Sequence, residues 1–269
     1  RIDNIMKIIY LDYNVISYLR TGNFPKNISP KLKEKVEFIK ENYSIAFSPA
    51  HLEDIAASKI RCGTSDDVIR SEIEFLTSIA GRNSLRPITR ETLKIYYDEY
   101  PIDCYHRVVS GYVGNDLIEP IEKKILEDAH SNPLSEPKEM NNISPEDIFD
   151  QFRKKQISCS LYKQGYLSES EIEKSLNWTF DDIKDKFYIV EAYINLAANL
   201  LEKLGYYRES ENKYRSRLHD VSHMIYGAYC DVFVSADKKM INKLKAIYSA
   251  LNIPTEVLSL LDFQNKLDC

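Results

Sequence analysis

The sequence lacks several features that define whole classes of protein. No stretch approaches the roughly 20 consecutive apolar residues of a transmembrane helix, and no basic-then-apolar leader opens the chain. The five cysteines are scattered, odd in number and without a CxxC pair, so neither a disulfide framework nor a zinc–cysteine site is indicated. There are also no internal repeats and no low-complexity tracts. These absences lead us to expect a cytoplasmic protein without a membrane partner.

An excess of positive charge is also missing, since the formal net charge is -5 at pH 7. Coating of nucleic acid by bulk electrostatics is therefore not indicated, but a nuclease is not excluded, because divalent cations can reverse the local sign of an acidic site. Basic residues do gather in two stretches, 213–217 and 238–245. Solvated helix faces are the plain alternative for each of them. The predicted substrate-binding residues are Arg215, Arg217, Lys238 and Lys239.

Four short apolar runs predict a parallel β-sheet. The stretch IIYLDYNVIS at residues 8–17 opens with a β-branched and aromatic run that is typical of a strand buried on both faces. Ser48 followed by Pro49 indicates a helix start directly after the second run. This order predicts an α/β fold with three layers, α/β/α, around one central parallel sheet. The expected strands cover 6–12, 44–47, 230–235 and 253–258.

Residues 64–215 differ from the segments on either side, because their local patterns are almost entirely helix signals. We predict a helical insertion that splits the α/β domain into residues 6–63 and 216–269. Within the insertion, an apolar seam over 181–204 alternates spacings of four and three and ends at Gly205, which indicates one long helix. The seam predicts docking within the chain, in a homodimer or against a partner protein. Its members are Ile183, Phe187, Val190, Ile194, Ala197, Leu201 and Leu204.

Acidic residues recur at the ends of the α/β elements. Asp12 ends the first strand, and Asp237 lies just past the third. Glu53 lies one turn into the helix after the second strand, and Asp220 lies early in the helix before the third. Such residues converge on the carboxyl edge of a parallel sheet, where their mutual repulsion favours hard divalent cations, Mg²⁺ or Mn²⁺. Asp231, at the start of the third strand, is a further candidate. Each acid taken singly could instead be a cap, a turn residue or a surface charge.

Four stretches, IIYLDYNVIS, FSPAHLEDIA, LHDVSHMIYGAYCD and DVFVSADKKM, resemble in order and spacing the motifs of PIN-like nuclease domains. The resemblance implies a parallel sheet between helices and metal-dependent cleavage of RNA, less often of DNA. The acids that it implies as catalytic are Asp12, Glu53, Asp220 and Asp237. The implied metal ligands are Asp12, Asp220, Asp237 and, as in only some members, Asp231, with Asn14 and Ser235 in support. The long insertion departs from compact bacterial toxins and favours comparison with larger defence or regulatory proteins.

We therefore expect a metal-dependent nuclease, foremost an endoribonuclease that acts on single-stranded or structured RNA in a toxin, defence or regulatory setting. Three alternatives stay open. One is a PIN-like scaffold or interaction protein without catalysis. Another is a zinc metalloprotease, because His219 and His223 have the spacing of its helical ligand pair. The third is a helical HD-type phosphohydrolase, for which His219 and Asp220 would form the dyad and His130 would be the nearest upstream histidine.

Overall fold

The computed structural model describes residues 6–40, 42–87, 89, 91–96, 98–111 and 118–268. At its centre lies a sheet of four parallel strands in the order β2-β1-β5-β6. The strands are β1 (Lys7–Leu11), β2 (Tyr43–Ala46), β5 (Val232–Ser235) and β6 (Glu256–Ser259). The prediction of four strands in one parallel sheet is confirmed, with small shifts at the strand ends.

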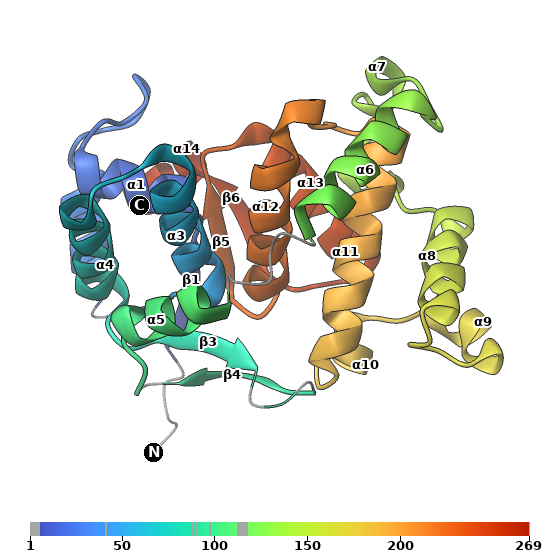
Figure 1. Ribbon diagram of the computed structural model, residues 1–269, viewed down its shortest axis with the longest axis horizontal. Coiled ribbons are helices and arrows are strands. Elements are labelled where there is room, and N and C mark those ends of the chain that lie inside the picture. The colour runs from blue at the N-terminus through green and yellow to red at the C-terminus, as the bar shows by residue number, and fades with distance from the viewer. Residues whose placement is uncertain are drawn as a thin grey trace.

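Helices cover both faces of this sheet (Figure 1). Side chains alternate along β1, so Ile9 and Leu11 belong to one apolar cluster and Tyr10 belongs to the other. The first cluster is closed chiefly by α1 (Tyr13–Thr21), α2 (Leu32–Ile39), α3 (Pro49–Cys62), α4 (Asp66–Ala80) and α14 (Leu260–Lys266). The second is closed chiefly by α11 (Phe187–Leu204), α12 (Tyr214–Gly227) and α13 (Lys238–Ala250). The expected α/β architecture is confirmed at this level.

Helix α3 begins where the sequence predicts, after Ser48. His51 takes the place of a capping glutamate, because its Nδ1 accepts a hydrogen bond from the Ser48 backbone N–H at 3.1 Å. Burial, with the neighbouring His223 ring, lowers the pKa of His51 to about 3 and keeps its ring neutral. Its Nε2 lies 2.8 Å from the Leu11 carbonyl oxygen. The first turn of α3 is thereby tied to the carboxyl end of β1.

The segment 64–215 is not helical throughout. It contains an antiparallel pair of short strands, β3 (Ser84–Pro87) and β4 (Leu93–Tyr96), which the helix signals did not predict. A parallel bridge between Phe47 and Ser84 connects this pair to the end of β2, so pairing partners and not an apolar pattern define these strands. The other helices of the segment are α5 (Pro101–Gly111), α6 (Ile118–Ser131), α7 (Pro137–Met140), α8 (Gln151–Lys163), α9 (Ile172–Ser175) and α10 (Phe180–Ile183).

The apolar seam is buried along its whole length, but the predicted single helix is interrupted. Helix α10 ends at Ile183 and α11 begins at Phe187, with residues 184–186 between them. The seam shares one apolar cluster with Tyr10 and Phe233 of the sheet, so the long helix docks within the chain. Although α11 is rich in apolar residues, no helix in the described ranges is long and apolar enough to cross a membrane.

Candidate functional site

Asp12 follows the last residue of β1 at the carboxyl edge of the sheet. Its backbone N–H donates to the Val234 carbonyl at 2.9 Å, so pairing with β5 fixes its position. The side chain is 5% exposed, and its Oδ2 accepts hydrogen bonds from Ser235 Oγ and Asn14 Nδ2, both at 2.6 Å. Burial raises the pKa of Asp12, although His223 and Ser235 partly oppose this shift. Both predicted supporting residues therefore contact this carboxylate.

Asp220 on α12 is a second acid at this edge. Burial raises its pKa well above the usual value, and the nearby carboxylates of Asp12 and Asp54 add to the shift. Lys243 and His223 oppose the shift without reversing it. Among the described residues, no hydrogen bond or ion pair reaches the Asp220 carboxylate. Added positive charge at this place would therefore stabilise the ionised form of both acids.

The acid from α3 that joins this pair is Asp54, where the sequence analysis predicted Glu53. Asp54 Oδ2 lies 2.8 Å from His223 Nε2. Burial alone would raise the pKa of Asp54, but this hydrogen bond and the charges of His223, His219 and His51 together lower it. Glu53 instead faces His219, with Oε2 3.7 Å from Nδ1. Successive helix residues point about 100° apart, so neighbours in sequence meet different partners. We call the following three residues the acid cluster: Asp12, Asp54 and Asp220.

A chain of buried polar side chains supports the acid cluster. Tyr10 Oη lies 2.7 Å from Ser48 Oγ and 2.7 Å from His223 Nδ1, so both ring nitrogens of His223 have a partner. Burial would lower the pKa of His223, but its hydrogen bond to Asp54 and the nearby charges of Asp54, Asp12 and Asp220 together raise the pKa. These hydrogen-bonded side chains connect β1, α3 and α12. These contacts were not predicted from the sequence. The signal present in the sequence was Tyr10 within a buried strand, because a buried tyrosine hydroxyl needs a hydrogen-bond partner.

Asp237 lies beside the acid cluster but serves as the N-cap of α13. Its Oδ1 accepts hydrogen bonds from the backbone N–H groups of Lys239, at 2.7 Å, and Met240, at 3.2 Å. Its own N–H donates to Ser235 Oγ at 3.0 Å, and that hydroxyl in turn donates to Asp12. Asp237 therefore has the capping role that was considered as an alternative. Ser235 lies between this cap and Asp12 of the acid cluster.

Asp231 lies at the opposite end of β5 from Ser235. There the backbone N–H of Ile8, near the start of β1, donates to its Oδ2 at 2.7 Å. The length of the strand thus separates Asp231 from Asp12. The structure does not bring Asp231 to the carboxyl edge, and this placement corrects its assignment as a metal ligand.

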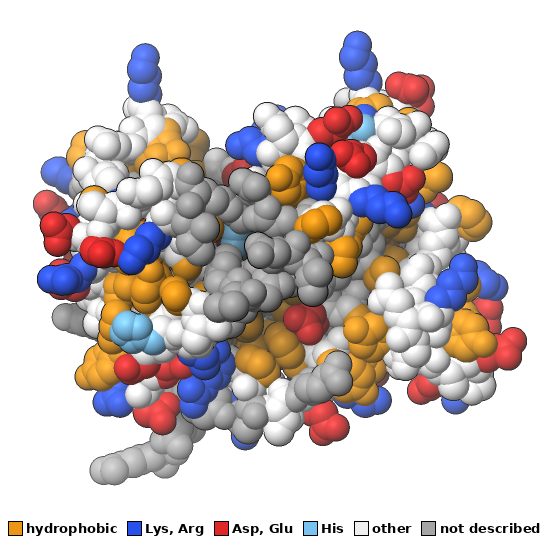
Figure 2. Space-filling view, viewed as in Figure 1, with side chains coloured by type: hydrophobic (Ala, Val, Ile, Leu, Met, Phe, Trp, Pro, Cys, Tyr) orange, Lys and Arg blue, Asp and Glu red, His pale blue; other side chains and the backbone are white. Residues whose placement is uncertain are grey.

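The predicted substrate-binding basic residues differ in their exposure. Arg217 is 3% exposed and pairs with Glu122 of α6, so it is wrong as a substrate contact in this arrangement. Lys238 is exposed and Lys239 is half-buried, while the side chain of Arg215 lies outside the described residues. On the face drawn in Figure 2, basic and acidic side chains are interspersed and do not form a basic patch.

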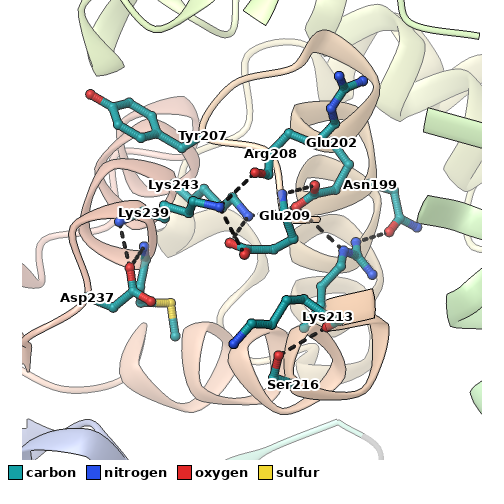
Figure 3. Close-up of polar contacts among 12 residues, drawn as sticks. Asn199, Glu202, Tyr207, Arg208, Glu209, Lys213, Ser216, Asp237, Lys239 and Lys243 are labelled. Carbon is teal, nitrogen blue, oxygen red and sulfur yellow. Dashed lines mark hydrogen bonds and ion pairs between the residues drawn. The ribbon is translucent and has the colours of Figure 1, made fainter. Parts of the chain in front are cut away.

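Lys243 belongs to a set of buried ion pairs (Figure 3), which Arg217 joins through Glu202. Lys243 Nζ donates to Glu202 Oε1 at 2.7 Å and to Glu209 Oε1 at 3.0 Å, and these acids hold the pKa of Lys243 above its usual value despite burial. Arg217 Nε lies 3.7 Å from Glu202. A cavity of about 10 Å³, lined in part by Asp220, lies among these groups. We call the following residues the ion network: Glu122, Glu202, Glu209, Arg217, Lys239 and Lys243.

Within the described residues, no three His, Cys, Asp or Glu side chains are already arranged to hold a metal ion. The donor chemistry nevertheless fits a divalent cation in two respects. Asp12 and Asp220 are carboxylates whose charge is disfavoured by burial, and carboxylate oxygens are the ligands that Mg²⁺ and Mn²⁺ prefer. His219 is buried, and neither of its ring nitrogens has a hydrogen-bond partner.

The two histidine-based alternatives are not favoured by these contacts. His219 and His223 face different acids of α3, so they do not present their nitrogens to one site as a metalloprotease pair would. His130, which the HD-type reading would need, lies at the end of α6 with Nε2 2.8 Å from the Glu209 carbonyl oxygen.

Comparison of the chain with known protein families, with curated proteins and with solved structures finds no match.

Proposed function

We propose that this protein is a metal-dependent nuclease that hydrolyses phosphodiester bonds, with RNA as its preferred substrate. The observation that carries this proposal is the meeting of Asp12 and Asp220, from distant parts of the sequence, at the carboxyl edge of a parallel sheet. Ligands of open α/β sheets bind at this edge. The resemblance of the surrounding motifs to PIN-like domains supports the choice of reaction.

Asp12 and Asp220 would hold the cation, Mg²⁺ or Mn²⁺. When bound, such a cation activates a water molecule and offsets the negative charge of the phosphodiester. Ser235 and Asn14 both donate to Oδ2 of Asp12 and so hold this carboxylate in one orientation. Asp54 is held by His223, and it adds negative charge to the place where a cation is needed.

The proposed substrate is single-stranded or structured RNA, cut within the chain. Because the net charge is -5, binding has to depend on the cation and on local contacts more than on bulk attraction. Lys238 offers one such contact, since it is exposed in the first turn of α13, next to Asp237. Contacts of this kind position a phosphate backbone without reading its sequence.

The direct test is an incubation of the purified full chain with labelled single-stranded RNA and DNA, in Mg²⁺, in Mn²⁺ and in excess chelator. We expect the ions to support cleavage of RNA into products with 5′-phosphate and 3′-hydroxyl ends, and chelation to abolish it. Cleavage that survives thorough chelation, or no cleavage under any of these conditions, contradicts the proposal.

A scaffold without catalysis is the second candidate, and two contacts favour it. Asp54 is engaged by His223, and Asp237 is engaged in capping α13. Both acids thus have structural partners that a scaffold would also need. Asp12 and Asp220 separate the two candidates, because a scaffold gains nothing from placing the Asp220 carboxylate where burial and the charge of Asp12 both disfavour its ionised form.

A further inference from the structure

A second, larger cavity, of about 370 Å³, lies where the first turn of α13 meets α6, α7 and the loop after α11. Its volume falls within the range of ligand-binding sites, about 300–1,000 Å³. We call it the outer cavity, to distinguish it from the small one among the ion network. Its polar and aromatic lining includes His130, Asn141, Tyr207, Arg208, Glu209 and Lys239.

The charged residues that line the outer cavity leave an excess of positive charge. Lys239 Nζ lies 3.2 Å from Glu209 Oε2, so these two charges offset each other. The Arg208 guanidinium donates to the Ala129 carbonyl oxygen at 2.7 Å, and no acidic side chain of the described residues pairs with it. Figure 3 shows this guanidinium pointing away from the ion network. Because a guanidinium has five N–H donors, Arg208 keeps donors for an anion.

Tyr207 brings an aromatic ring to the same cavity. Its φ of 46° is uncommon for a residue other than glycine, so the turn that carries it has to be held by its surroundings. Asn141 Oδ1 accepts the Tyr207 N–H at 2.7 Å, and the Tyr206 ring packs edge-on against the Tyr207 ring with 4.9 Å between centroids. In Figure 3 the Tyr207 ring also points away from the ion network. The turn therefore presents an aromatic ring and a guanidinium from consecutive residues.

The outer cavity adjoins the acid cluster through the start of α13. The backbone N–H of Lys239, which lines the cavity, donates to Asp237 Oδ1 at 2.7 Å. The N–H of Asp237 donates to Ser235 Oγ, and that hydroxyl donates to Asp12. A strand with one phosphate at the acid cluster therefore has the outer cavity within reach of a neighbouring nucleotide.

We propose that the outer cavity binds one nucleotide of a single-stranded RNA substrate, beside the phosphodiester that is cut. Arg208 contacts a phosphate, because a guanidinium forms charge-assisted hydrogen bonds to phosphate oxygens. A base stacks on Tyr207, as bases do on the aromatic side chains of proteins that bind single strands. The inference rests on the proposed nuclease function, which supplies the strand, and it deepens that function by naming the residues that hold the substrate.

Fluorescence anisotropy of a labelled short single-stranded RNA, titrated with the full chain in excess chelator, measures binding without cleavage. Arg208→Gln removes one charge and should weaken binding roughly tenfold. It should also reduce the slope of the logarithm of the binding constant against the logarithm of salt concentration by about 0.7, the loss of one phosphate contact. Arg70→Gln is the matched control, because Arg70 is exposed on α4, which Figure 1 places far from α6 and α7. It should change neither value.

Two variants of Tyr207 separate stacking from charge. Tyr207→Asn introduces a residue that tolerates the left-handed backbone but lacks the ring. It should weaken RNA binding roughly fivefold or more and leave the salt slope unchanged. Tyr207→Phe keeps the ring and should bind RNA as the wild type does. Unchanged affinity in a folded Tyr207→Asn variant would overturn the stacking of a base here.

Asn141→Asp tests the cavity if Arg208→Gln does not fold. It keeps the acceptor for the Tyr207 N–H and adds a negative charge to the lining, so RNA should bind more weakly. Folded Arg208→Gln and Asn141→Asp variants that bind RNA as tightly as the wild type overturn the inference, and so does a wild type that binds no RNA. Free 5′-AMP, titrated in place of RNA, distinguishes a strand from a free nucleotide. Binding of AMP as tight as that of RNA would overturn the assignment to a strand.

The two proposals fail separately. RNA cleavage together with unchanged RNA binding in the Arg208 and Asn141 variants would overturn this inference and leave the nuclease function standing. RNA binding that depends on Arg208, in a protein that cuts no nucleic acid, would support the cavity as an RNA site and overturn the nuclease function.

Discussion

The ion network and the acid cluster are built in opposite ways. In the ion network, three acidic side chains face three basic ones, and Lys243 alone contacts two carboxylates. In the acid cluster, Asp12 and Asp220 have raised pKa values, and the ring of His223 is the one basic group in hydrogen-bonding contact with a cluster member among the described residues. The charges of the ion network balance one another, whereas the acid cluster carries an excess of negative charge.

This difference separates a structural role from a chemical one. The ion network connects α6, α11, α12 and α13 with the loop after α11, so its ion pairs hold these elements together. In the acid cluster, burial and neighbouring carboxylates disfavour the ionised forms of Asp12 and Asp220, at an edge of the sheet where ligands bind. Proteins break the rules of polar satisfaction mainly at functional sites. We therefore assign stability to the ion network and chemistry to the acid cluster.

The largest expected effect is on cleavage, in the acid cluster. Asp12→Asn keeps the size of the side chain and an acceptor for Ser235 but removes the charge that would hold the cation. We expect the cleavage rate to fall roughly 10²- to 10⁴-fold, the range seen for single groups of a catalytic site. Asp231→Asn is the control, since that acid lies at the opposite edge of the sheet and its loss should leave the rate unchanged. Equal rates for Asp12→Asn and the wild type would contradict the assignment.

The same variant should change the pH dependence of stability in the metal-free protein. Asp12 and Asp220 have raised pKa values in the folded state, so their contribution to stability is fully present below about pH 4 and is lost as the pH rises through the folded-state values. Asp12→Asn removes part of this loss. Its Tm without metal should therefore equal or exceed that of the wild type at pH 7, and the difference should shrink toward pH 4.

The next largest effect is on folding, in the ion network. Lys243→Met leaves Glu202 and Glu209 buried without their shared cation, and breaking such a buried pair costs about 3–5 kcal/mol in the free energy of unfolding. Urea unfolding measures this loss. Lys245→Met, an exposed position on the same helix, is the matched control and should stay within about 0.5 kcal/mol of the wild type.

A double variant sharpens this result. Adding Glu202→Gln to Lys243→Met restores the balance of charge, so the double variant should be less destabilised than the sum of the two single changes. Additive losses would mean that Lys243 and Glu202 are not coupled, and the ion network would then lose its structural role.

The sequence predicted those parts of the fold that depend on local patterns. Buried apolar runs mark the four parallel strands, and Ser48 with Pro49 marks the start of α3. The strands β3 and β4 escaped prediction because they are short and are defined by pairing with each other and by the bridge from Phe47 to Ser84. The seam of α11 was predicted, but its docking on the sheet was one of several possibilities, because a pattern within one helix does not name its partner.

The candidate site shows the same limit. Asp12, Asn14 and Ser235 could be located because strand ends converge in a parallel sheet. The choice between Glu53 and Asp54 could not be made, since it depends on which side of α3 faces α12. The burial of Arg217 could not be predicted from the sequence either, because its partners lie on helices that are distant in sequence and only folding brings them together.

The smallest expected effect concerns Asp237, where capping and chemistry can be separated. Asparagine caps a helix as well as aspartate, whereas alanine costs about 0.5–2 kcal/mol. Asp237→Asn should therefore keep the wild-type stability and Asp237→Ala should lose about 1 kcal/mol, both measured by urea unfolding. Because Oδ1 of Asp237 is held by two backbone N–H groups and Ser235 separates the residue from Asp12, we expect Asp237→Asn to slow cleavage far less than Asp12→Asn. If the two variants lose cleavage equally while Asp237→Asn stays fully stable, Asp237 belongs with the acid cluster, and the excess of negative charge at this edge is larger than the three acids assigned to it.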